Sequence, residues 1–194
     1  MGTSWVYTHK SSGKVVANCH KIPQTQFEKQ LLSIQQITNS LNRMIQLVNE
    51  VNPDTQIIFS VSPVRHLKDG FVENTLSKSH LISAVHHVIA SHKNSDVLSY
   101  FPSYEIQLDE LRDYRFYKED MLHPNALAVT YIWERFVSVW MADSTHQLMK
   151  MVETIQKGLA HKPFNPDSEA YKNFLKDLEF KINHLKEDYP FLNF

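Results

Sequence analysis

Residues 56–62 read QIIFSVS, a nearly continuous apolar run with turn-forming residues on both sides. Short runs of this kind are typical of a strand that is buried on both faces of a parallel sheet. Residues 96–102 read DVLSYFP and repeat the pattern after a helical segment. Because parallel neighbours are joined through a helix, the two runs predict a parallel sheet that is covered by helices.

Apolar residues at helical spacing surround these two strands. The longest example follows Ser33, which forms a capping box with Gln36, and Pro53 ends it. Ser77 is expected to cap the helix between the two strands. The full set of expected helices covers residues 22–32, 33–52, 77–92, 125–141, 143–160 and 166–187. The last two have no strand partner and are therefore expected to form a C-terminal extension.

The N-terminal residues carry strand patterns. Aromatic and β-branched residues at 4–8 and 14–18 predict a hairpin that turns at Gly13. Residues 104–113, YEIQLDELRD, predict a short strand that enters a helical turn. The chain has only four glycines, and a strand-like run starts at residue 3 with no element before it. Both features lead us to expect that the first strands of the domain are missing.

The composition limits the class of protein. With 42% hydrophobic and 21% charged residues, it is typical of a soluble globular domain. The net charge of -1 argues against a nucleic-acid or anionic-membrane surface. No apolar run approaches the length of a membrane span, and no signal peptide opens the chain, so the sequence assigns no compartment. Cys19 is the single cysteine, which excludes an internal disulfide.

Two further patterns in the sequence bear on metal binding and on nucleic-acid binding. Several histidines fall within residues 80–92, yet no pair has the i, i+4 spacing of a zinc-binding helix. We expect neither a metal nor an organic cofactor. Residues 112–117, RDYRFY, combine two arginines with three aromatic residues. Stacking on nucleic-acid bases is one interpretation, but the near-neutral charge favours salt bridging within the loop.

Residues 117–124 read YKEDMLHP and place Asp120 and His123 immediately before the helix expected at 125–141. Side chains three residues apart meet on one face of a turn. His123 could take a proton from a nucleophile while the Asp120 carboxylate orients its ring. The alternative is a capping histidine beside a surface aspartate. Spacing alone favours that alternative, because D-x-x-H is short and common.

The chain also resembles a known family over most of its length. The matching stretches are GTSWVYTHKSSGKVVANCHK (2–21), FSVSPVRHLKDG (59–70), SYFPSYEIQLDELRDYRFYKEDMLHP (99–124), ALAVTYIWERF (126–136) and HKPFNPDSEAYKNFL (161–175). They resemble the GSCFA-domain family, a group within the SGNH (GDSL-type) hydrolases. The resemblance implies that Asp120 and His123 are the carboxylate and the base of a catalytic triad.

The resemblance also implies a fold class. That class is α/β, with a three-layer parallel sheet flanked by helices (SGNH/flavodoxin-like), here without its N-terminal strands and with a C-terminal helical extension. A partial α/β domain is expected at 1–142. The helical extension is expected at 143–194, packed on that domain.

The family is named for a G-S-C-F-A motif near its N-terminus, where SGNH enzymes carry the nucleophilic serine, and no such string occurs here. The third block of SGNH enzymes, G-x-N-D, aligns with Gly2, so Ser4 stands where an oxyanion-binding asparagine is expected. A serine hydroxyl can donate one hydrogen bond to an oxyanion. The chain is therefore expected to hold the base without the nucleophile and to lack triad catalysis by itself.

The loop after the strand at 56–62 carries Ser62, Arg65 and His66, which are expected at the same sheet edge as Asp120. Arg65 could bind a carboxylate or phosphate of the substrate through its planar guanidinium, or bond loop carbonyls instead. Ser62 is an alternative nucleophile, although no glycine-flanked elbow surrounds it.

Residues 17–21, ANCHK, are a further candidate segment. A nucleophilic pair of Cys19 and His20 is disfavoured, because adjacent residues of a strand point to opposite faces. A role in loop architecture is favoured, with Asn18 or His20 reaching the cleft.

Two functions from different classes remain. The first is a serine esterase or acyltransferase that acts on a small-molecule or glycan ester, with no nucleic-acid partner and no membrane span. The second is a non-catalytic binding or scaffold module, which Ser4, the absent nucleophile and the helical tail support. The apolar stripe of that tail, residues 165–188, could also mediate self-association through the C-terminal helices.

Overall fold

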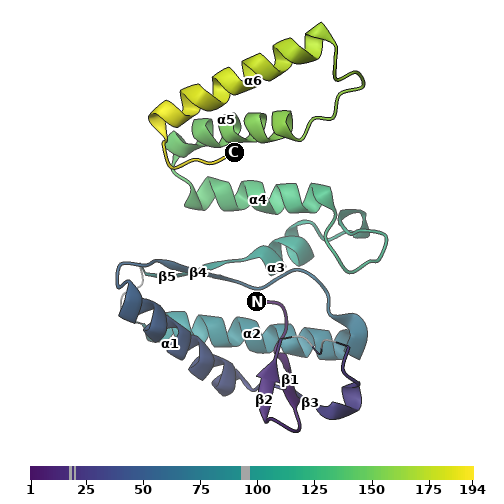
Figure 1. The fold of residues 1–194 in the computed structure, drawn as a ribbon. Coiled ribbons are helices and arrows are strands. Elements are labelled where there is room, and N and C mark those ends of the chain that lie inside the picture. The colour runs from purple at the N-terminus through teal and green to yellow at the C-terminus, as the bar shows by residue number, and fades with distance from the viewer. Residues whose placement is uncertain (18, 20, 93–96) are drawn as a thin grey trace. The chain divides into compact units, whose positions relative to one another are not determined.

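The apolar run at 56–62 forms strand β4 (Ile57–Ser60) in the computed structural model, which describes residues 1–17, 19, 21–92 and 97–194. β4 pairs in parallel with β5 (Leu98–Phe101), and Phe59 lies opposite Tyr100. Within the described residues this parallel sheet has two strands (Figure 1). The prediction of a mixed α/β protein is confirmed, whereas a three-layer parallel sheet is not seen.

Two helices pack on this pair of strands and bury the core of the first unit. They are α1 (Ile34–Val51) and α2 (Phe71–Ser91), which lie side by side in Figure 1. The core comprises Ile37, Leu41, Ile45, Phe59, Val61, Leu81, Ala84, Val85, Val88 and Leu98. Burial of these apolar side chains is the main stabilising contribution to this unit, at roughly 25 cal/mol per Å² removed from water.

The starts of the two helices differ in how well they were predicted. The capping box of α1 is confirmed, because Ser33 Oγ accepts from Gln36 N (3.2 Å) and Gln36 Oε1 accepts from Ser33 N (2.9 Å). The predicted start of α2 at Ser77 is wrong, since the helix begins at Phe71 after Gly70. Ser77 is instead a mid-helix residue whose hydroxyl accepts from the buried Ser4 N (2.8 Å).

A three-stranded antiparallel sheet in the order β2-β1-β3 precedes α1. Its strands are β1 (Trp5–His9), β2 (Lys14–Val16) and β3 (Phe27–Leu31). The hairpin of β1 and β2 is confirmed, and Gly13 has the positive φ of 64° that its turn requires. The short helix predicted at 22–32 is wrong. A 3₁₀ turn at Gln24–Gln26 leads into β3, which pairs with β1.

After β5 the chain turns through α3 (Ser103–Glu105) into a π-helical turn at Ile106–Glu110. The short strand predicted within 104–113 is therefore wrong. Tertiary bonds override the strand pattern here, since Ser103 Oγ donates to Val61 O (2.8 Å) and Tyr100 Oη donates to Glu105 Oε1 (2.9 Å). The wider π turn places the Gln107 side chain in the interior, with no exposed surface.

The chain divides into two compact units, Met1–Phe136 and Val137–Phe194. Helix α4 (Ala126–Trp140) runs across this boundary. The second unit contains α5 (Asp143–Leu159) and α6 (Glu169–Asp188), which pack through Ile155, Leu178 and Leu185. The helices predicted at 125–141, 143–160 and 166–187 are confirmed. Among the described residues, no helix combines the length and the apolar character that crossing a membrane requires.

Candidate active site

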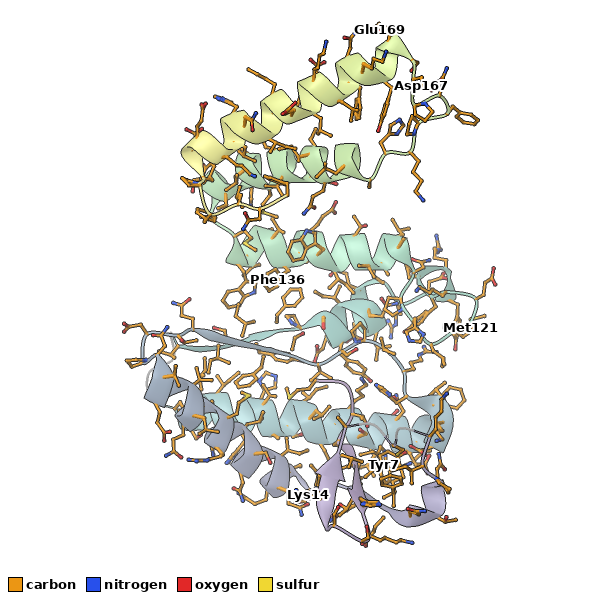
Figure 2. All side chains as sticks on the ribbon, in the orientation of Figure 1. Tyr7, Lys14, Met121, Phe136, Asp167 and Glu169 are labelled. Atoms are coloured by element: carbon orange, nitrogen blue, oxygen red, sulfur yellow. The ribbon has the colours of Figure 1, made fainter. Side chains whose placement is uncertain are left out.

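A short, internally bonded loop precedes α4 and carries Asp120 and His123; Figure 2 labels its Met121. Lys118 N donates to His123 O (2.8 Å), and an isolated bridge joins Tyr117 to Pro124. These contacts close the loop into a tight turn. Aspartate suits such a turn, because its side-chain oxygens can bond backbone N–H groups. Within the turn Met121 has a positive φ of 59°.

Asp120 and His123 form a direct hydrogen bond. His123 Nδ1 lies 2.7 Å from Asp120 Oδ2, while Asp120 Oδ1 accepts from Leu122 N (2.8 Å) and His123 N (3.0 Å). With Nδ1 donating to the carboxylate, the Nε2 lone pair at the other side of the ring is free to accept a proton. The imidazole is half exposed, so a reacting group can reach it.

A second Asp-x-x-His pair in the same chain provides an internal comparison. Asp143 and His146 on α5 have the same spacing, but His146 Nδ1 lies 3.7 Å from Asp143 Oδ1 and the aspartate is fully exposed. That distance is too long for a hydrogen bond. The spacing by itself therefore does not create an oriented imidazole; the turn around Asp120 does.

The surroundings of Asp120 determine its charge. The pKa of this carboxyl is lowered to about 2, first by the backbone N–H groups of His123 and Leu122 and then by the His123 ring. Hydrogen bonds to the ionised form stabilise that form. Asp120 is therefore a carboxylate at all ordinary pH values and can only accept hydrogen bonds, which keeps the His123 tautomer constant.

The loop that follows β4 contacts the loop of the Asp120–His123 pair. Arg65 N donates to Leu122 O (3.1 Å), and Arg65 Nη1 lies 3.4 Å from Met121 O. The Arg65 guanidinium stacks over the ring of Tyr117 at 4.3 Å. The structure thus brings Arg65 to the same place as His123, as the sequence predicted for the end of this strand.

His66 lies close to the N-terminal segment. Its backbone N–H donates to Asn74 Oδ1 (2.8 Å) on α2. A Cβ at Gly2 would lie 3.2 Å from His66 Nε2, so the glycine permits this approach. Burial, followed by the charges of Lys78 and His123, lowers the pKa of His66.

A buried lysine ties these segments together. Lys78 is 1% exposed, and its ammonium donates to Gly2 O and to Ser62 O, each at 2.6 Å. One side chain of α2 therefore fixes both the N-terminal segment and the loop after β4. Burial lowers the pKa of Lys78 to about 8.

The two candidate serines lie in different surroundings. Ser62 Oγ accepts from Val64 N (3.2 Å) at the start of the loop after β4. Ser4 is 2% exposed, and its hydroxyl donates to Ser77 O (3.1 Å) inside the first unit. The Ser4 hydroxyl is thus bonded to α2. Neither serine hydrogen-bonds to His123 among the described contacts.

Comparisons with known families cover both units. A model described as the GSCFA family matches residues 1–136, and one described as the GSCFA domain protein, C-terminal domain, matches residues 152–194. The chain belongs to the GSCFA family. No curated protein and no solved structure matches it.

The buried side chains of this GSCFA chain that the sequence did not predict include Lys78, Gln107 and Tyr117. A signal was available for Lys78, which shares the inward face of α2 with Leu81 and Val85, a position where a charge is unusual. No pattern in the sequence indicates Gln107 or Tyr117, because both reach the site through turns that form only in the folded chain.

Two predictions for the GSCFA chain remain, one on the ANCHK segment at 17–21 and one on metal binding. Asn18 and His20 lie outside the described residues. Within residues 1–17, 19, 21–92 and 97–194, no group of three or more histidine, cysteine or acidic side chains is arranged to hold a metal ion.

Proposed function

We propose that this GSCFA protein is an SGNH-type ester hydrolase or acyltransferase in which His123 is the general base and Asp120 orients it. The single observation that carries the proposal is the 2.7 Å bond between His123 Nδ1 and an Asp120 carboxylate that two backbone N–H groups hold ionised. This is the relation between base and orienting acid in serine hydrolase triads. The parallel pair β4–β5 supports an SGNH-like sheet as the setting.

The chemistry follows from the free Nε2 of His123. It takes the proton of a serine hydroxyl while the serine oxygen attacks the acyl carbon of the ester. The resulting imidazolium, stabilised by Asp120, returns the proton to the departing alcohol and leaves an acyl-enzyme. Water then repeats the sequence and releases the acid, or a second alcohol takes the acyl group.

We assign the nucleophile of this mechanism to a serine other than those that the structure describes. None of the described serines is bonded to His123, and Ser62 already accepts a bond within its own loop. Ser62 is the alternative inside the chain. The two assignments differ in their response to Ser62→Ala, which removes activity only if Ser62 attacks.

The acyl portion of the substrate has a candidate groove. A cavity of about 290 Å³ is lined in part by Pro63 and Pro124, which follow Ser62 and His123 in the chain. Its other walls are mainly apolar and include Phe101, Val129, Ile132 and Trp133. An acyl chain bound there would place its carbonyl near His123, while an alcohol such as a carbohydrate would face the polar side.

The test is hydrolysis of p-nitrophenyl acetate by the full-length protein and its His123→Ala and Asp120→Asn variants. We expect His123→Ala to lower kcat by about 10² or more, the usual contribution of a general base. Asp120→Asn keeps an oxygen for the backbone N–H groups but presents an NH₂ group to Nδ1, so kcat should fall as well, by no more than in His123→Ala.

His146→Ala is the matched control, because it removes a histidine of the same D-x-x-H spacing that is not hydrogen-bonded to its aspartate. It should leave kcat unchanged, and circular dichroism should show that all variants are folded. Equal activity of wild type and His123→Ala on every ester cleaved would rule out His123 as the base.

A second candidate is a non-catalytic binding or scaffold module. The observation that favours it is Ser4, whose hydroxyl is buried and bonded to Ser77 where an oxyanion donor would be expected. Such a module would bind an intact ester with equal affinity in wild type and His123→Ala, and the full-length protein would cleave none.

A further inference from the structure

A second cavity, of about 210 Å³, lies against the loop of the Asp120–His123 pair. Arg65 lines it and also bonds Leu122 O, and Tyr117, another lining residue, bridges to Pro124. The polar and aromatic residues around it are Arg65, Gln107, Arg112, Asp113, Tyr114 and Tyr117. At about 30 Å³ per water, the volume equals roughly seven waters, enough for a group up to the size of one sugar acid.

Gln107 is the strongest evidence that this cavity is a binding site. The side chain has no exposed surface, yet neither its Nε2 nor its Oε1 has a hydrogen-bond partner among the described residues. Leaving a buried amide unpaired costs about 1–3 kcal/mol for each group. The Oη of Tyr117, a second wall residue, is also buried without a partner. Unsatisfied donors and an unsatisfied acceptor therefore belong to two residues of the cavity wall.

The charges on the wall favour an anion. Neither Arg65 nor Arg112 forms an ion pair within the part of the chain that the structure describes, and Arg65 stacks over Tyr117 and Tyr114. Asp113 is the one acidic wall residue, and its carboxylate is already bonded to Arg115 through Oδ1 (2.8 Å) and Oδ2 (3.1 Å). Two guanidinium groups are thus left without a compensating charge.

We infer that this cavity is a subsite for a carboxylate-bearing, hydroxyl-rich group, such as a sugar acid, bound by Arg65 and Arg112 with Gln107 and Tyr117 bonding its hydroxyls. Guanidinium groups match the planar geometry of a carboxylate, and a primary amide can both donate to and accept from a hydroxyl. The inference rests on the proposed function only in assigning this group to the alcohol side of the ester.

The test is a chemical-shift titration of the full-length protein with D-glucuronate, D-glucose and inorganic phosphate. Glucuronate should bind more tightly than glucose, which lacks the carboxylate, and more tightly than phosphate, which lacks the adjacent hydroxyls. Arg112→Met should weaken glucuronate binding by about tenfold or more, as the loss of one charge-assisted bond predicts. Arg112 is exposed, so this change leaves the core intact.

Gln107→Leu separates a binding role from a structural one. Replacing an unpaired buried amide by an apolar group of similar shape should leave the stability to urea unchanged or higher, because the polar atoms have no bonds to lose. Glucuronate binding should nevertheless weaken by about tenfold. Lys118→Met is the matched control, because Lys118 is an exposed cation that does not line the cavity.

Three results would overturn the inference: equal affinity for glucose and glucuronate, tighter binding of phosphate, or unchanged glucuronate binding in both Arg112→Met and Gln107→Leu. The titration needs no turnover. His123→Ala should bind glucuronate as the wild type does, so a failure of the proposed hydrolysis is distinguishable from a failure of this subsite.

Discussion

At the scale of single residues, Lys78 is an important structural residue near the candidate site, because it bonds two separate segments. Its ammonium donates to the carbonyls of Gly2 and Ser62, and the side chain is almost completely buried. A lysine can satisfy several acceptors with one charge, whereas an apolar side chain of the same length can satisfy none. Lys78 therefore joins both the N-terminal segment and the loop after β4 to α2.

Lys78→Met should lower the free energy of unfolding by about 1–3 kcal/mol, because two carbonyls lose a charged donor. Urea denaturation of the full-length protein measures it. Lys68→Met, on the neighbouring exposed turn, is the control and should stay within about 0.5 kcal/mol of the wild type. Equal stability of both variants would contradict the role of Lys78.

The same residue predicts a pH dependence. Burial lowers the pKa of Lys78 from 10.5 to about 8, so in this window the unfolded chain binds a proton that the folded chain has released. Stability rises with pH wherever the unfolded state binds more protons. The wild type should therefore gain stability relative to Lys78→Met as pH rises from about 8 toward 10, and a constant difference between them would contradict the lowered pKa.

At the scale of elements, α1 illustrates how much a local pattern can determine. Its capping box satisfies the backbone N–H groups of Ser33 and Gln36, and its apolar residues at helical spacing face the core. Both features are encoded within neighbouring residues. The helix start was therefore predictable, in contrast to that of α2.

Ser33→Ala should destabilise the first unit by about 1 kcal/mol, because the N–H of Gln36 loses its acceptor. Ser33→Asp keeps an acceptor at the same position and should be close to the wild type. Urea denaturation followed by circular dichroism compares the three proteins. A loss of the same size in both variants would show that the hydroxyl does not act as a cap.

At the scale of the whole molecule, part of the apolar stripe of α6 is buried inside the second unit. Leu178 and Leu185, which the sequence assigned to a stripe for burial or association, are buried with Ile155 of α5. Phe180, on the other side of α6, is 72% exposed. We propose that the C-terminal helices self-associate through this exposed face.

Phe180→Glu should then abolish any increase of molar mass with concentration in sedimentation experiments, because an apolar contact is replaced by a charge. Asn173→Asp adds the same charge to an exposed position of the same helix and should leave association unchanged. Association that persists in Phe180→Glu would place the contact elsewhere.

The local parts of this protein were predictable from its sequence. Strands β4 and β5, the hairpin at Gly13, the cap of α1 and the spacing of Asp120 and His123 all follow from residues close together in the chain. Even the hydrogen bonds of the Asp120 carboxylate are local, since they join it to Leu122 and His123. Local chemistry can specify such features because no distant partner is required.

What the sequence by itself determined is therefore an α/β chain with an Asp-x-x-His turn at the start of a helix. Tertiary structure decided that residues 27–31 form a strand, because β1 supplies the backbone partners that a helix would have found within itself. It also decided that Lys78 would meet Ser62, and that Gln107 would line one cavity with Arg65 and Arg112. Lys78 and Ser62 lie on different elements, and Arg65 is distant in the chain from Gln107 and Arg112. Only the packing of α2 and the π turn against the strands brings them together.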